Sequence, residues 1–217
     1  MKLSNEKLTY AILIVIILVG GTSVGLLAGN VIEHGESPTS STQSVYSLTL
    51  IVQHHIFFNS SVGYQPAFFV LQNGTLENSS MIYVPAHTLI DLTIVSYDNG
   101  LSPLESAQYA NVSGTVGGIQ YVFNSTIPVN MGLNKTISTY FQVVKSENAS
   151  NIAHTFTVPQ LKLNIPLEPI STTFAQFYAN TTGSFMWQCF AECGSGPYGT
   201  AGAMATPGWM TGTLVVY

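Results

Sequence analysis

The sequence predicts an all-β sandwich preceded by one N-terminal membrane-spanning helix. Three features of the 217-residue chain support this fold class. A long uncharged segment lies near the N-terminus, short runs rich in β-branched and aromatic residues follow it, and Gly, Asn and Pro turns separate those runs. No later segment keeps a helical period of apolar residues. Once the N-terminal segments are set aside, enough chain remains for one domain with a sizeable core.

The first element is a membrane anchor. Residues 8–32 carry no charge and exceed the roughly 20 residues that a bilayer-spanning helix needs. Lys2 and Lys7 precede this segment and acidic residues follow it, so the positive-inside rule places the N-terminus in the cytoplasm. A cleaved signal peptide is the other interpretation, although its apolar core is usually shorter. We expect residues 1–32 to be a cytoplasmic tip and single-pass anchor in the cell membrane, with the C-terminal domain on the extracytoplasmic side.

A polar linker, 33–44, leads into a β domain that spans 45–217. Within the run 89–97, the apolar residues Ile90, Leu92 and Ile94 alternate with polar ones, as expected for a half-buried strand. Residues 98–134 are rich in turn-forming residues, and their sequence predicts no strand or helix. The runs that read as strands are 47–52, 54–58, 81–87, 89–97, 137–144, 174–178, 185–188 and 212–217.

Composition excludes some functions and favours an exported surface. Only 7% of the residues are charged and arginine is absent, which excludes the basic patches of nucleic-acid-binding proteins. Asn-X-Ser/Thr sequons follow the anchor and predict an extracellular glycoprotein, although chance matches are expected in a chain this rich in Asn, Ser and Thr. The eight sequon asparagines are Asn59, Asn73, Asn78, Asn111, Asn124, Asn134, Asn148 and Asn180.

Sulfur-bearing residues gather near the C-terminus and indicate a metal site. Cys189 and Cys193, the two cysteines of the chain, lie between two strand-like runs, and Met210 begins the last run. His154 offers an imidazole upstream. Thiolate, thioether and imidazole together favour copper, because thioether sulfur is a poor ligand for zinc. No histidine follows Cys193.

Several short motifs resemble those of cupredoxins. V-P-A-H-T at 84–88 is similar to the family's turn before an alternating strand, and H-T-F at 154–156 to the context of its first histidine ligand. The segments 185–189 and 210–216 resemble the strand that delivers the copper cysteine and the closing M-x-G-x-V-x-V strand. The resemblance implies a cupredoxin-like Greek-key β-sandwich that carries electrons through copper.

The C-x3-C spacing most resembles the CuA domain of cytochrome c oxidase subunit II. This resemblance implies copper ligation by His154, Cys189, Cys193 and Met210. Pro197 stands where the CuA pattern has its second histidine, so both a mononuclear and a variant binuclear copper site remain open. Met204 is a further candidate for any remaining position.

The resemblance implies a membrane-anchored copper protein that transfers electrons from a redox donor to a membrane oxidase or another acceptor. It would act as a carrier or as a subunit II-like component of a respiratory oxidase, rather than as a catalyst by itself. The alternative is a glycosylated structural or adhesive surface β-sandwich, with Cys189 and Cys193 in a disulfide and no copper. Copper delivery or storage is a third interpretation.

The remaining histidines of the domain carry no predicted function. His54 and His55 are adjacent, so on a regular strand they face opposite sides. We expect one of them at the surface and the other in the core, and we expect His87 in a loop.

Overall fold

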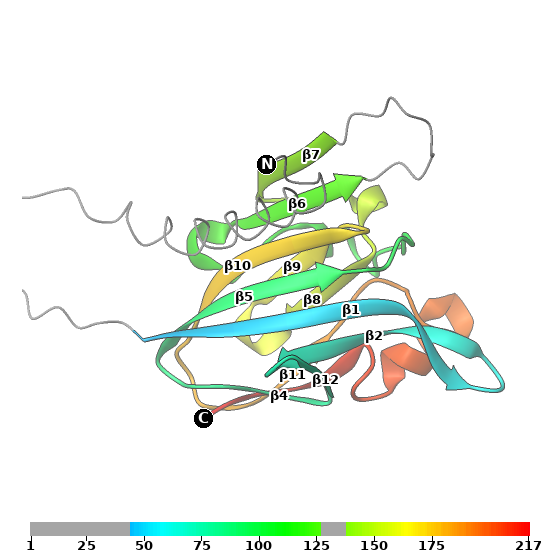
Figure 1. Ribbon diagram of the computed structural model, residues 1–217, viewed down its shortest axis with the longest axis horizontal. Coiled ribbons are helices and arrows are strands. Elements are labelled where there is room, and N and C mark those ends of the chain that lie inside the picture. The colour runs from blue at the N-terminus through cyan, green and yellow to red at the C-terminus, as the bar shows by residue number, and fades with distance from the viewer. Residues whose placement is uncertain (1–43, 127–137) are drawn as a thin grey trace, which may run out of the picture. The chain divides into compact units, whose positions relative to one another are not determined.

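The computed structural model describes residues 44–126 and 138–217, all of which lie within one compact unit, Thr42–Tyr217 (Figure 1). The predicted anchor and the linker up to residue 43 fall outside the described residues. In the part of the chain that is described, no helix has both the length and the apolar character needed to cross a bilayer.

Within the described ranges the fold is all-β, as predicted, and contains no α-helix. The strands are β1 (Val45–Asn59), β2 (Gly63–Gln72), β3 (Thr75–Asn78), β4 (Met81–Val84), β5 (Thr88–Ser96), β6 (Gln120–Thr126), β7 (Ser138–Val144), β8 (His154–Val158), β9 (Leu163–Leu167), β10 (Ser171–Ala179), β11 (Gly183–Gln188) and β12 (Thr211–Val216). Short 3₁₀ turns connect them: η1 (Ala107–Ala110), η2 (Val116–Gly118), η3 (Ala149–Asn151), η4 (Pro159–Leu161), η5 (Pro197–Gly199) and η6 (Gly202–Ala205).

The strands form two mixed sheets. One has the order β3-β2-β1-β5-β10-β6-β7 and the other β4-β12-β11-β8-β9. The pairs β1/β5 and β12/β4 are parallel, while the other neighbours in both sheets are antiparallel. Two mixed sheets without an α-helix are consistent with a cupredoxin-like sandwich. In Figure 1, β8 and β9 of the second sheet are seen behind β10 and β5 of the first.

Apolar side chains from both sheets fill the space between them. In β5, Ile90, Leu92 and Ile94 are buried while Asp91 is exposed, which confirms the predicted alternation. Phe68, Phe156 and Trp187 are among the largest fully buried side chains. Each side chain of this size contributes about 1.5–3 kcal/mol when it leaves water, so this core is the main source of stability.

A bulge in β1 changes the expected placement of two histidines. Three steps along β1, from Gln53 to Ile56, match only two steps along β2. The extra residue breaks the alternation of sides. His54 and His55 are therefore both exposed, and the expectation that one of them lies in the core is wrong.

Candidate metal centre

The ends of three strands of the smaller sheet bring the predicted ligands together. His154 is the first residue of β8, Cys189 directly follows β11, and Met210 directly precedes β12. β11 lies between the other two strands, with Gln188 opposite Thr157 on β8 and Thr211 on β12. Residues separate in sequence therefore meet at one end of this sheet.

Three of the four predicted ligands form a tight cluster. The Sγ atoms of Cys189 and Cys193 are 3.6 Å apart, and Nδ1 of His154 lies 3.9 Å from Sγ of Cys189. The ligand atoms of all three residues lie within 4.8 Å of one another. Both cysteines are free thiols, so the structure does not contain the disulfide that the alternative interpretation requires.

The spacing of these atoms fits a single metal ion. Tetrahedral coordination with metal–nitrogen and metal–sulfur bonds of roughly 2.0 and 2.3 Å places neighbouring donors about 3.5–3.8 Å apart. The observed Sγ–Sγ distance of 3.6 Å lies inside this range, and the Nδ1–Sγ distance of 3.9 Å is slightly above it. The distances between the donor atoms and their chemistry, one imidazole nitrogen and two cysteine sulfurs, therefore suit a soft metal ion.

Asp98 orients the imidazole of His154. Its Oδ2 atom lies 2.7 Å from Nε2 of His154, and its Oδ1 accepts a hydrogen bond of 2.7 Å from the backbone N–H of Gly100. Metal-binding histidines commonly donate their second ring N–H to such a carboxylate, which leaves the other nitrogen free to bind. Here that other nitrogen is Nδ1, which faces Cys189. Sequence reasoning assigned Asp98 no role, and its position after a buried strand was the only signal.

The electrostatics of the cluster favour a deprotonated Cys189. Burial alone would raise the pKa of this thiol, but hydrogen bonds from Cys193 and His154 and the charge of His154 hold the pKa well below its usual range. Burial also opposes the charged form of His154, yet the hydrogen bond to Asp98 and the interaction with Cys189 raise the His154 pKa to about 9. The hydrogen bond to Cys189, together with burial, raises the pKa of Cys193 well above its usual range. Metal binding would therefore release protons mainly from His154 and Cys193.

A methionine thioether also touches the cluster, and it belongs to Met204. Its Sδ lies 3.4 Å from Sγ of Cys193. Met210 is buried, and its backbone carbonyl accepts a 2.8 Å hydrogen bond from the N–H of Cys189. Ligation by the Met210 sulfur stays a prediction, because the contacts recorded for the described residues place its backbone, not its thioether, at the site.

The cluster is shielded from water. Cys189 is 0% exposed and His154 1% exposed, whereas Cys193 is partly buried. The segment after β5 covers one side, because Glu105 donates a backbone hydrogen bond to Phe190 and Glu192 donates one to Pro103. Part of the stretch that the sequence left unassigned thus forms a wall of the site.

The glycine-rich insert after Cys193 forms a compact loop in place of the missing second histidine. Backbone hydrogen bonds of 2.8 and 3.1 Å pair Ser195 with Ala201 and close the loop. Gly199 has a φ of +71°, and an added Cβ there would meet the Glu192 carbonyl oxygen at 2.7 Å, so glycine is required. Pro197 is exposed, and within the described residues the metal-ligand cluster contains one histidine.

Comparisons with known proteins give weak structural similarities. No family model matches the chain, and no curated protein matches it. Rusticyanin from Thiobacillus ferrooxidans shares 11% identity over 81% of this chain and 79% of its own, with a TM-score of 0.31. A heme-copper terminal oxidase dimer shares 11% identity over 98% of this chain and 99% of its own, with a TM-score of 0.34. A multicopper oxidase shares 14% identity over 84% of this chain and 46% of its own, also with a TM-score of 0.34. TM-scores this low do not establish a common fold, so the functional assignment rests on the geometry of the site.

Proposed function

We propose that this domain binds copper and transfers electrons. The observation that carries the proposal is the cluster of His154 Nδ1, Cys189 Sγ and Cys193 Sγ, in which His154 and Cys189 are buried and Cys193 is partly buried, with Asp98 on the far side of the imidazole. The Met204 thioether adds a third sulfur at its edge. Thiolate, imidazole and thioether donors together select copper over the harder divalent cations.

The single histidine favours a mononuclear centre. One nitrogen, two cysteine sulfurs and one thioether complete four positions around one ion, whereas two ions would need further donors. Copper would supply a reversible one-electron couple at this position. The chain's own residues hold the geometry: Asp98 fixes the imidazole, and Thr155 donates its backbone N–H to Sγ of Cys189 at 3.3 Å.

Burial favours electron transfer over catalysis. A substrate needs an open coordination position, whereas an electron can cross a short protein barrier to a buried ion. Met204 lies between the cluster and the surface: its thioether contacts Cys193, and the residue also lines a surface groove of about 590 Å³ beside β11 and β12. The groove and Met204 therefore offer a route for electrons between the surface and the cluster.

The cellular setting is a proposal from the sequence. The uncharged segment 8–32 would tether the domain to the outer face of the cell membrane. There it would accept electrons from a reduced donor and pass them to a membrane oxidase, either as a tethered carrier or as a subunit II-like component.

The test is spectroelectrochemistry with electron paramagnetic resonance on the copper-loaded full chain in detergent. We expect one reversible one-electron wave and hyperfine splitting from a single copper nucleus. Splitting from two equivalent nuclei would establish a binuclear centre instead. Copper that binds but cannot be cycled reversibly would contradict electron transfer and support storage or delivery. Asp91→Asn, an exposed change in β5, is the matched control.

A further inference from the structure

Three of the four histidines within the described residues, His54, His55 and His154, lie at the same end of the sandwich. β1 runs parallel to β5 with Val52 opposite Ser96, so His54 and Asp98 each lie two residues beyond that pair. Asp98 in turn contacts His154. His54 and His55 are both at the surface, and His54 lies near the carboxylate that contacts His154.

The β1 bulge places the two exposed imidazoles close together. Their ring centroids are 5.6 Å apart, with an interplanar angle of 48°. Two imidazoles that share one ion through metal–nitrogen bonds of about 2.0–2.1 Å have ring centres roughly 4.5–6 Å apart. The observed separation lies inside this range, so the spacing of the two rings is compatible with one shared ion.

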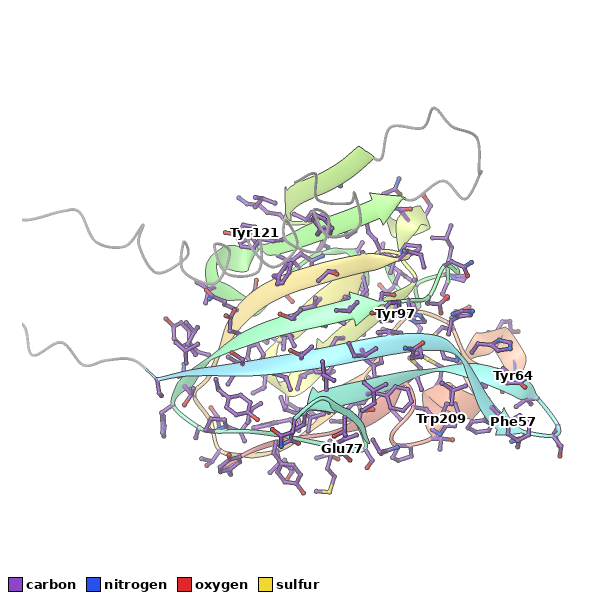
Figure 2. The ribbon with its side chains drawn as sticks, in the orientation of Figure 1. Phe57, Tyr64, Glu77, Tyr97, Tyr121 and Trp209 are labelled. Carbon is purple, nitrogen blue, oxygen red and sulfur yellow. The ribbon has the colours of Figure 1, made fainter. Side chains whose placement is uncertain are left out.

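One ring of the pair is held in place by an aromatic neighbour. The imidazole of His55 stacks on the ring of Tyr64, with centroids 3.9 Å apart and an interplanar angle of 8°. Figure 2 shows Tyr64 on the β1–β2 hairpin, at the end of the domain where the loop after β11 also lies. A ligand that is already ordered loses less conformational entropy on binding a metal.

The Asp98 carboxylate lies near His54 and interacts with it electrostatically. The carboxylate that interacts with His54 would also attract a bound cation. Imidazole nitrogens suit Cu(II), Ni(II) and Zn(II), and Cu(II) has the highest affinity of these divalent ions.

We propose that His54 and His55 form a second, exposed Cu(II) site at the β1 bulge, from which copper is loaded into the buried cluster. The existence of this site is independent of the proposed function, whereas its loading role rests on it. The ion would be held by the two imidazoles and by water, and then pass inward along the side of the domain that carries Asp98 and His154.

The binding test uses the full-length Cys189→Ser/Cys193→Ser variant, in which copper can no longer be held by thiolates. Cu(II) titration followed by electron paramagnetic resonance should give one site with nitrogen hyperfine structure. Adding His54→Gln and His55→Gln should weaken this binding at least tenfold. His87→Asn is the matched control, since His87 is an exposed histidine with a φ of +52° that asparagine tolerates.

Unchanged binding after His54→Gln/His55→Gln, or an equal loss with His87→Asn or His34→Gln, would overturn the site. The loading role is tested in the protein with both cysteines present, by the rate at which the thiolate charge-transfer band grows after Cu(II) is added. The histidine double variant should slow this rate at least tenfold at limiting copper while the final absorbance stays the same. An unchanged rate would overturn the loading role alone. A wild-type protein that never develops the band would contradict the proposed function and the loading role, and leave the surface site to be judged by the titration.

Discussion

Replacing Asp98 by Asn tests whether this carboxylate prepares His154 to bind a metal. Asp98 accepts a hydrogen bond of 2.7 Å from Nε2–H of His154, so Nδ1, which faces Cys189, is the ring nitrogen that gives up its proton when a metal binds. An asparagine can present its NH₂ group to Nε2 instead, which would move the ring proton to Nδ1, the atom needed for ligation. Its carbonyl can still accept the N–H of Gly100, so the local backbone is retained.

Loss of such a supporting contact typically costs 10- to 100-fold in metal affinity, or about 1.4–2.7 kcal/mol. We expect the upper part of this range, because the contact is short and the side chains of His154 and Asp98 are only 1% and 12% exposed. The assay is competition for Cu(I) against a chelator of known affinity, with the full chain in detergent. Asp91→Asn in the same sheet is the control for removal of one carboxylate charge.

Equal copper affinity in Asp98→Asn and the wild type would refute the reasoning. It would mean that the carboxylate serves packing alone. Thermal unfolding of both metal-free proteins should accompany the titration, so that a loss of affinity caused by unfolding is recognised.

Three further predictions concern the sulfur ligands, a carboxyl group and a glycine. Met204→Leu should shift the redox potential of the copper-loaded protein. The free energy of unfolding should change by less than about 1.5 kcal/mol, because the substitution keeps the side-chain volume. A larger shift in redox potential from Met210→Leu would identify the Met210 sulfur as the ligand instead. Burial and a neighbouring carboxylate raise the pKa of Glu147 to about 7, so the folded state binds this proton more tightly than the unfolded state does. Chemical denaturation should show the free energy of unfolding falling by about 1–2 kcal/mol as pH rises from about 4.5 to 7; this figure allows for the partial exposure of Glu147. Glu147→Gln should remove this dependence of the unfolding free energy on pH. Gly114→Ala should lower the free energy of unfolding by about 2–4 kcal/mol, because φ is +71° and the new Cβ would lie 2.7 Å from the β9 backbone. Gly74→Ala is the control: φ is +79°, but no atom lies within 4 Å of the new Cβ, so the loss should be only about 1–2 kcal/mol.

The sandwich was predictable where a strand has one buried and one exposed face. β5 shows this alternation from Ile90 to Ile94, and so it was recognised. β8 and β9 are buried at every position, so their sequences do not alternate. Pro166 also argues against a strand, and it is tolerated because β9 is an edge strand of its sheet.

The clustering of the two thiols was predictable because Cys189 and Cys193 are close in sequence and chemically distinctive. Asp98 was not, because its contact with His154 joins residues 56 positions apart and depends on where two loops end. The side-by-side placement of His54 and His55 also escaped prediction. It follows from a bulge, which adds a residue without a signature in the alternation of polar and apolar side chains.

The most direct test of the central claim is the copper content and visible spectrum of the full chain, reconstituted with copper under reducing conditions and then oxidised. The buried His154–Cys189–Cys193 cluster predicts about one copper ion per chain, with thiolate charge-transfer absorption that is lost in Cys189→Ser. Absence of bound copper, with both cysteines of the native protein titrating as a disulfide, would contradict the account and make this domain a copper-free surface sandwich.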